Sequence, residues 1–188
     1  MRRLALLLAS VALPLSGADL HAQRVTVDLR GVVTMSTEDL PNTDLGTGYG
    51  FGGTLALRVM PHLHLYGGWD WLHFAPDQSF RGPNMDFEET GYTFGLRFEH
   101  PFVPTSALAY RIEAGGIYKH VEIEDDGDVI EDTGHDLGFE LGLGAVVPLG
   151  TIWRLTPALR YRSVALDFAA AAGDMRYTAL EVGISRRF

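Results

Sequence analysis

Alternation of apolar and polar residues in the C-terminal segment constrains this chain more than any other feature. Leu180, Val182, Ile184 and Phe188 fall on one parity, while polar or small residues occupy most of the other. Side chains two residues apart lie on the same face of a strand, so this pattern predicts a β-strand with two unlike faces. The strand runs directly into a terminal aromatic residue.

The N-terminal segment predicts export from the cytoplasm. Two arginines follow Met1, an apolar run covers 4–15, and small residues follow it. This is the layout of a cleaved secretory signal peptide. The alternative is an N-terminal membrane anchor, but the run is too short for a spanning helix of about 20 residues. We therefore predict a signal peptide at 1–22 and one domain over 23–188. Cleavage is expected after one of two residues, Ala18 or Ala22.

Composition limits the functions open to this chain. It contains no cysteine, which excludes disulfides, thiol catalysis and cysteine-ligated metals. Its net charge is −9 and Lys119 is its only lysine, so no nucleic-acid partner is expected. Hydrophobic residues make up 46% of the chain, yet no segment after the signal approaches a transmembrane helix. Alternating strands are how such a chain shows apolar residues to lipid.

About eight segments alternate in this way, each near the 9–11 residues that a tilted membrane strand needs. They cover residues 24–34, 47–59, 63–74, 91–99, 106–121, 136–147, 151–164 and 177–188. Short connections that carry Pro or Gly alternate with long polar ones at 35–46, 75–90, 122–135 and 165–176. The predicted fold is all-β: a closed antiparallel up-and-down transmembrane β-barrel of about eight strands. Both termini are expected on the periplasmic, short-turn side.

The two faces of these segments differ in a way that indicates which one meets lipid. One face is large, apolar and aromatic, whereas the other combines glycine with charges of both signs. A soluble barrel would place its apolar face inside and solvated charges, usually including lysine, outside. Glycine with arginine and carboxylates instead suits a narrow lumen, where small residues make room and opposite charges pair.

We therefore predict that the charged face lines the lumen. The expected ion-pair network consists of Arg30, Arg58, Arg97, Arg111, Glu113, Glu140, Arg160 and Glu181. The same face also carries Asp28, Asp70, Glu99, Arg154 and Arg162. Aromatic residues towards the strand ends suit interfacial girdles, namely Trp69, Trp71, Tyr92, Tyr110, Tyr118, Trp153 and Tyr161.

By size, strand number and its last strand, residues 23–188 resemble the small OmpA- and OmpX-type outer-membrane β-barrel domain. The resemblance implies location in the cell outer membrane, contact with its lipid and lipopolysaccharide, and a monomer. In that superfamily the barrel-assembly machinery reads the last strand and its terminal Phe, so the resemblance makes Phe188 the assembly signal. Arg186 departs from the aromatic residue often found third from the end.

Few residues suggest chemistry, and we expect no catalytic residue, cofactor or metal site. The acidic segment 122–136 does not match an EF-hand loop and is expected to be a solvated loop, with cation binding left open. His62 and His64 lack an evident third ligand. Lipid A deacylases resemble the chain in size but use a His and a Ser two positions apart, and no His-x-Ser occurs here.

The sequence thus predicts a non-enzymatic integral outer-membrane protein with a structural or surface-interaction role. Its long loops would lie outside the cell. One alternative is a narrow channel for small solutes, which a barrel of about eight strands disfavours because side chains just fill it. The other alternative is a lipid-modifying enzyme.

Overall fold

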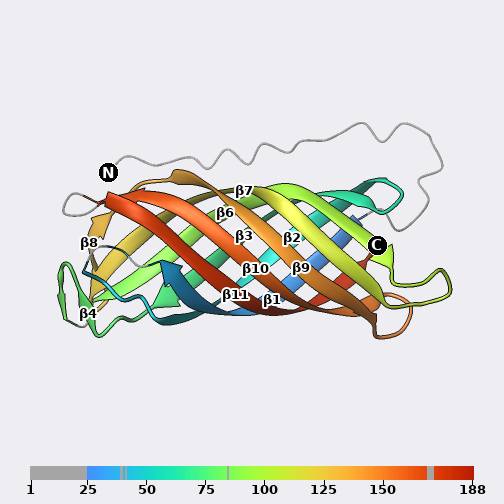
Figure 1. The fold of residues 1–188 in the computed structure, drawn as a ribbon, viewed down its shortest axis with the longest axis horizontal. Coiled ribbons are helices and arrows are strands. Elements are labelled where there is room, and N and C mark those ends of the chain that lie inside the picture. The colour runs from blue at the N-terminus through green and yellow to red at the C-terminus, as the bar shows by residue number, and fades with distance from the viewer. Residues whose placement is uncertain (1–24, 39, 41, 84, 169–171) are drawn as a thin grey trace, which may run out of the picture.

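The computed structural model describes residues 25–188 except for 39, 41, 84 and 169–171, so the predicted signal peptide lies outside the described residues. Within this part of the chain, eight long tilted strands form one closed antiparallel barrel (Figure 1). The predicted fold is therefore confirmed. No helix among these residues is long and apolar enough to span a membrane.

The barrel strands follow one another around the wall in chain order. They are β1 (Val25–Glu38), β2 (Thr47–Met60), β3 (Leu63–Phe74), β6 (Asp86–Pro101), β7 (Ala109–Asp125), β9 (Asp136–Pro148), β10 (Trp153–Asp167) and β11 (Ala172–Arg187). Three short strands lie at the end where the long connections gather: β4 (Gln78–Ser79), β5 (Gly82–Pro83) and β8 (Asp128–Asp132). We call this the long-loop end, and the opposite end, where the C-terminus lies, the short-turn end (Figure 1).

Pairing of the first strand with the last closes the sheet. Leu29 of β1 lies opposite Ile184 of β11, and the N–H of Phe188 donates to the carbonyl oxygen of Val25 at 2.8 Å. Closure leaves no open strand edge, and an open edge would expose unpaired backbone groups to lipid. The alternation of the C-terminal segment therefore places its apolar row on the outer wall of a closed sheet.

The two faces of the strands differ in exposure as the alternation predicts. On β1, Asp28 is 2% exposed whereas its neighbour Leu29 is 63% exposed. On β9, Glu140 is buried completely while Leu141 and Leu143 are exposed. The outer wall consists of such exposed apolar side chains, which is the pattern of a surface that meets lipid.

The strands extend further than the sequence patterns indicated at the long-loop end. β6 begins at Asp86 and β7 continues to Asp125, inside two segments that we expected to be loops. The sequence patterns missed these strand ends because the alternation of apolar outward and polar inward residues is inverted beyond the lipid-facing wall, towards the long-loop end. There the outward positions are polar, as at Glu88 and Glu122, and the inward positions are apolar, as at Phe87.

A tight hairpin also replaces much of the expected acidic loop at 122–135. β7 pairs with β8 around a turn whose central residues are Asp126, with φ 51°, and Gly127, with φ 88°. Two consecutive positive φ values are typical of a type I′ turn, for which Asp-Gly is a favoured pair. The acidic residues therefore lie on an ordered β-hairpin.

Candidate functional site

Buried charges of equal number and opposite sign line the barrel interior. Among the described residues, seven buried cations face seven buried carboxylates, and we call these fourteen side chains the lumen network. The cations are Arg30, Arg97, Arg111, Lys119, Arg154, Arg160 and Arg162. The carboxylates are Asp28, Asp70, Glu89, Glu99, Glu113, Glu140 and Glu181. Because none is more than 8% exposed, the network forms an electrically neutral filling of the lumen.

Near the short-turn end, each carboxylate of the lumen network bridges two arginines. Asp28 lies 2.6 Å from Arg97 and 3.3 Å from Arg111, measured between side-chain oxygen and nitrogen atoms. Glu99 in turn joins Arg111, at 3.0 Å, to Arg154, at 2.9 Å. Such charge-assisted hydrogen bonds are about twice as strong as neutral ones, so these contacts hold four strands together from inside.

The same pattern continues through the middle of the barrel to the long-loop end. Glu113 accepts from Arg160 at 2.6 Å, and Glu140 accepts from Arg162 at 3.0 Å. Arg162 then reaches Asp70 at 2.6 Å. The pairs thus form a continuous chain along the barrel, which leads from Arg154 through Glu99, Arg111, Asp28, Arg97, Glu113, Arg160, Glu140, Arg162 and Asp70 to Lys119 and Glu89.

Glycines provide the room for one large polar side chain within this chain of ion pairs. Tyr66 crosses the lumen, and its hydroxyl donates to Glu140 at 2.6 Å. A Cβ added at Gly115 would lie 2.6 Å from the Tyr66 hydroxyl oxygen, and one at Gly95 would lie 2.9 Å from it. The inward glycines therefore allow the network to pack without clashes.

The structure brings seven of the eight residues expected in the ion-pair network into contact with partners: Arg30, Arg97, Arg111, Glu113, Glu140, Arg160 and Glu181. It places Arg58 elsewhere, exposed at the short-turn end beside a register shift between Arg58 and Met60. In the described part of the chain no carboxylate lies within 4.0 Å of its side-chain nitrogens. Arg58 therefore lies outside the lumen network.

Two members of the lumen network were missed by the sequence patterns. Lys119 is completely buried and lies 2.5 Å from Asp70, and it also contacts Glu89. Glu89 fell inside a segment expected to be a loop. The parity of both residues could have identified them. Glu89 lies two residues before Gly91 and four before Thr93, both on the inward face, and Lys119 has the parity of the inward Arg111 and Glu113.

Apolar side chains fill the barrel interior above the lumen network, at the long-loop end. We call this cluster the apolar plug. It consists of Val32, Leu40, Leu45, Leu72, Phe74, Phe87, Ile117, Val121, Ile123, Val164, Leu166, Phe168, Met175, Tyr177 and Ala179. Phe80, from the turn between β4 and β5, packs over it with its ring 5.3 Å from that of Phe168. Tyr177 joins the two layers, since its hydroxyl donates to Glu89 at 2.6 Å.

The outside of the long-loop end is strongly acidic. Fifteen described carboxylates gather there against two arginines, Arg81 and Arg176, and we call this surface the acidic crown. Its carboxylates are Glu38, Asp44, Asp77, Asp86, Glu88, Glu122, Glu124, Asp125, Asp126, Asp128, Glu131, Asp132, Asp136, Asp167 and Asp174. Slight desolvation, followed by the charges of Glu88 and Glu122, raises the pKa of the Glu124 carboxyl above its usual value. The acidic crown therefore carries uncompensated negative charge.

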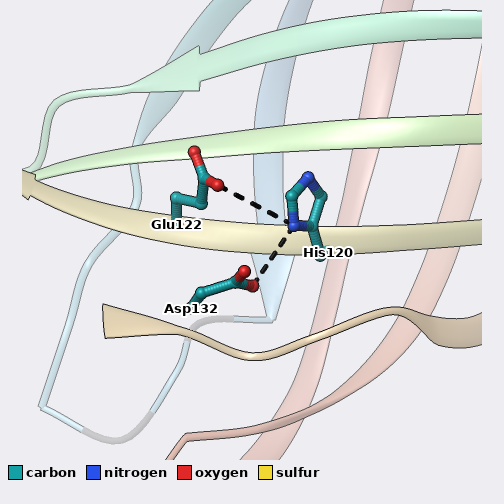
Figure 2. A group of neighbouring side chains, drawn as sticks. All are labelled: His120, Glu122 and Asp132. Atoms are coloured by element: carbon teal, nitrogen blue, oxygen red, sulfur yellow. Dashed lines mark hydrogen bonds and ion pairs between the residues drawn. The ribbon is translucent and has the colours of Figure 1, made fainter. Parts of the chain in front are cut away.

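One part of the acidic crown combines an imidazole with two carboxylates (Figure 2). Nδ1 of His120 lies 3.2 Å from a carboxylate oxygen of Asp132 and 4.0 Å from one of Glu122. One ligand atom from each residue lies within 4.8 Å of the other two. Nitrogen and carboxylate oxygen are ligands that zinc accepts, so among the described residues these three could hold a divalent transition metal. An ordinary hydrogen bond between His120 and Asp132 accounts for the same geometry.

Comparison with known proteins identifies the family. The sequence matches the model of the outer membrane protein beta-barrel domain over residues 4–188, so the chain belongs to that family and is located in the cell outer membrane. A search of curated proteins found no match. Outer-membrane barrels have short periplasmic turns and longer extracellular loops, so we expect the acidic crown to lie outside the cell.

Solved structures with a similar fold come from several bacteria. Neisserial surface protein A has a TM-score of 0.65 and 14% identity, over 87% of this chain and 97% of that one. OprG of Pseudomonas aeruginosa has a TM-score of 0.61 and 12% identity, over 89% and 97%. Ail of Yersinia pestis, in complex with the heparin analogue sucrose octasulfate, has a TM-score of 0.56 and 12% identity, over 89% of this chain and 99% of that one. At these identities the likeness concerns the fold.

Proposed function

We propose that this member of the outer membrane protein beta-barrel family is a non-enzymatic surface anchor, which presents its acidic crown to cationic groups outside the cell. The observation that carries the proposal is the separation of charge along the barrel. The lumen network is neutral, whereas among the described residues the crown carries fifteen carboxylates and two arginines. A surface with such an excess of one sign attracts partners of the other sign and repels like-charged ones.

The extended strands support this role by making the crown rigid. β7 and β8 carry many of its carboxylates on a paired hairpin. Arg81, from the β4–β5 turn, donates its Nε to Glu131 of β8 at 2.6 Å and so ties the two hairpins together. A preorganised surface loses less conformational entropy on binding than a mobile loop does.

A channel is the second candidate, and the filling of the lumen argues against it. Arg97 and Arg162 are each no more than 1% exposed, as are Phe74 and Phe87 of the apolar plug. Charged and apolar layers follow each other along the barrel, so an ion would have to displace both.

Ail provides a contrast in partner chemistry. That barrel was solved with a heparin analogue, sucrose octasulfate, which is a polyanion. The carboxylates of the acidic crown repel such a ligand. Phosphates of lipopolysaccharide are also anionic, so cations would have to bridge them to the carboxylates of the acidic crown. Lipid and lipopolysaccharide remain the proposed neighbours of a monomer, with the barrel-assembly machinery reading Phe188 during biogenesis.

Neutralising the tip of the β7–β8 hairpin is expected to weaken binding to a polycation. In the triple variant Asp125→Asn, Asp126→Asn and Asp128→Asn, three negative charges are lost, and asparagine tolerates the positive φ of Asp126. At about 0.5 kcal/mol for each exposed charge, affinity for surface-bound polylysine should fall about tenfold. The measurement compares barrels in nanodiscs on polylysine and heparin surfaces at low and high salt.

The matched control keeps the charge, with Asp125→Glu and Asp128→Glu, and should bind polylysine as the unchanged protein does. Equal binding of the unchanged protein to heparin and to polylysine would refute the proposed charge preference. Unaltered polylysine binding by the triple variant would remove the hairpin from the interaction surface.

A further inference from the structure

A cavity of about 430 Å³ opens at the short-turn end of the barrel, on the periplasmic side. We call it the vestibule. The charged and imidazole side chains in its lining are those of Arg58, His62, His64, Glu99, Arg154 and Arg187. The volume lies within the range of about 300–1,000 Å³ that small-molecule sites occupy. The lumen network closes its inner end, so the vestibule communicates with the periplasm.

The vestibule carries an excess of positive charge. Glu99 is its single carboxylate among the described residues, and Glu99 already pairs with Arg154 at 2.9 Å and Arg111 at 3.0 Å. Each side-chain nitrogen of Arg154 also has a hydrogen-bond partner, since the two that do not contact Glu99 donate to Ser185 at 3.1 Å and to Thr26 at 3.3 Å. The guanidinium groups of Arg58 and Arg187 remain, and no described carboxylate lies within 4.0 Å of either.

The neutrality of the lumen network means that this excess has no compensation deeper in the barrel. Seven cations there already match seven carboxylates, so none is left to pair with Arg58 or Arg187. The remaining described side-chain carboxylates lie at the opposite, long-loop end, in the acidic crown. Two guanidinium groups at one cavity therefore have no carboxylate side chain as a partner, and they can bind an anion from outside the protein.

The vestibule also offers an unsatisfied polar group. His64 is 8% exposed, and its Nδ1 has no hydrogen-bond partner among the described residues. Its neighbour His62 is held by a contact of 3.0 Å between its Nδ1 and the carbonyl oxygen of Glu99. Buried polar groups without a partner are rare and usually indicate a missing ligand, ion or water.

We propose that the vestibule binds a phosphate group from the periplasmic side, between Arg58 and Arg187. The planar fork of guanidinium matches phosphate oxygens in pairs, and two such groups balance a doubly charged phosphate. Soluble phosphates carry such a group, and the headgroups of inner-leaflet phospholipids carry phosphate as a singly charged diester. This site is independent of the proposed extracellular role, because it lies at the other end of a closed barrel.

Calorimetric titration of inorganic phosphate into the refolded full barrel, in a maltoside detergent free of phosphate, tests the site. We expect one binding event. The double variant Arg58→Gln and Arg187→Gln should weaken it at least a hundredfold, about tenfold for each guanidinium, which corresponds to about 1.4 kcal/mol each. The shift of the folded band on unheated gels establishes that each variant is folded.

Arg186→Gln is the matched control. Arg186 is adjacent to Arg187 and has the same charge, but it lies outside the barrel with its guanidinium carbon 4.6 Å from the ring centre of Phe188. It should leave phosphate affinity unchanged. No phosphate binding by the unchanged barrel, or equal losses in the Arg186 variant and the double variant, would overturn the proposal.

Repeating the titration in nanodiscs distinguishes the two sources of phosphate. If a lipid headgroup occupies the vestibule, the phospholipids of the disc should compete, so the apparent affinity for inorganic phosphate should be lower in nanodiscs than in the maltoside detergent. If a soluble phosphate is the ligand, the affinity should be the same in nanodiscs and in detergent.

Discussion

Replacement of Asp70 by Asn should lower the free energy of unfolding by about 3–5 kcal/mol, the usual cost of removing one partner from a buried ion pair. Asp70 is completely buried and contacts three cations: Arg30 at 3.0 Å, Arg162 at 2.6 Å and Lys119 at 2.5 Å. The variant leaves the lumen network with an excess positive charge at its most crowded point. Urea unfolding of the barrel refolded in lipid vesicles measures the loss.

Removing a cation as well should restore part of that stability. The double variant Asp70→Asn and Lys119→Met returns the lumen network to neutrality, so its loss should be smaller than the sum of the two single losses by about 0.5–3 kcal/mol. Asp167→Asn in the acidic crown is the control and should change stability by less than about 0.5 kcal/mol. Strict additivity of the two lumen substitutions would contradict the network as a coupled unit.

Leu141→Arg should destabilise the barrel by about 2–4 kcal/mol, because it places a charge in the middle of the lipid-facing wall. Leu141 is 53% exposed on β9, and its register partners are Ala114 of β7 and Tyr161 of β10. Nothing in lipid can hydrate or pair with the new guanidinium group. The same unfolding assay in vesicles measures this loss.

Leu137→Arg provides a control on the same strand and the same face. Leu137 lies four residues nearer the acidic crown, 69% exposed, where the cost should fall to about 0–1 kcal/mol. The depth dependence is the signature of lipid contact. Equal losses at Leu141 and Leu137, or none at either, would contradict the assignment of the outer wall.

The barrel itself could be predicted from the sequence because membrane strands obey a simple rule. Where lipid surrounds the wall, outward positions such as Leu141 must be apolar, and inward ones such as Glu140 are free to be polar. Both the strand number and the faces follow from this period of two. The C-terminal strand shows it most clearly, since it runs to the end of the chain.

The upper barrel could not be predicted because water replaces lipid around it and inverts the rule. Glu122 and Glu124 point outward and Ile123 inward, so a search for apolar outer faces takes this segment for a loop. The apolar plug was hidden for the same reason, since Phe87 and Leu166 lie in segments expected to be irregular. These residues have the same parity as the inward residues of the lumen network on the same strands, and this parity is the sequence feature that could have revealed them.

Membership of the lumen network was predictable by face but not by depth. Arg58 has the inward parity of Thr54 and Ala56, yet it lies beyond the last paired carboxylate and reaches the vestibule. Lys119 lies opposite Gly91 on the neighbouring strand, so its pairing with Glu89 depends on the register between β6 and β7. Sequence gives the order of residues on a strand, whereas strand tilt decides which carboxylate each cation meets.

Single-channel recording in planar bilayers tests most directly the claim that the barrel is closed and acts through its two ends. Refolded protein, shown to be folded by the shift of its band on unheated gels and reconstituted in vesicles that fuse with the bilayer, is compared with a porin treated in the same way. We predict a silent membrane with the unchanged protein, because the lumen network and the apolar plug fill the described lumen. Reproducible unitary current steps from the unchanged protein would contradict the account and support a channel.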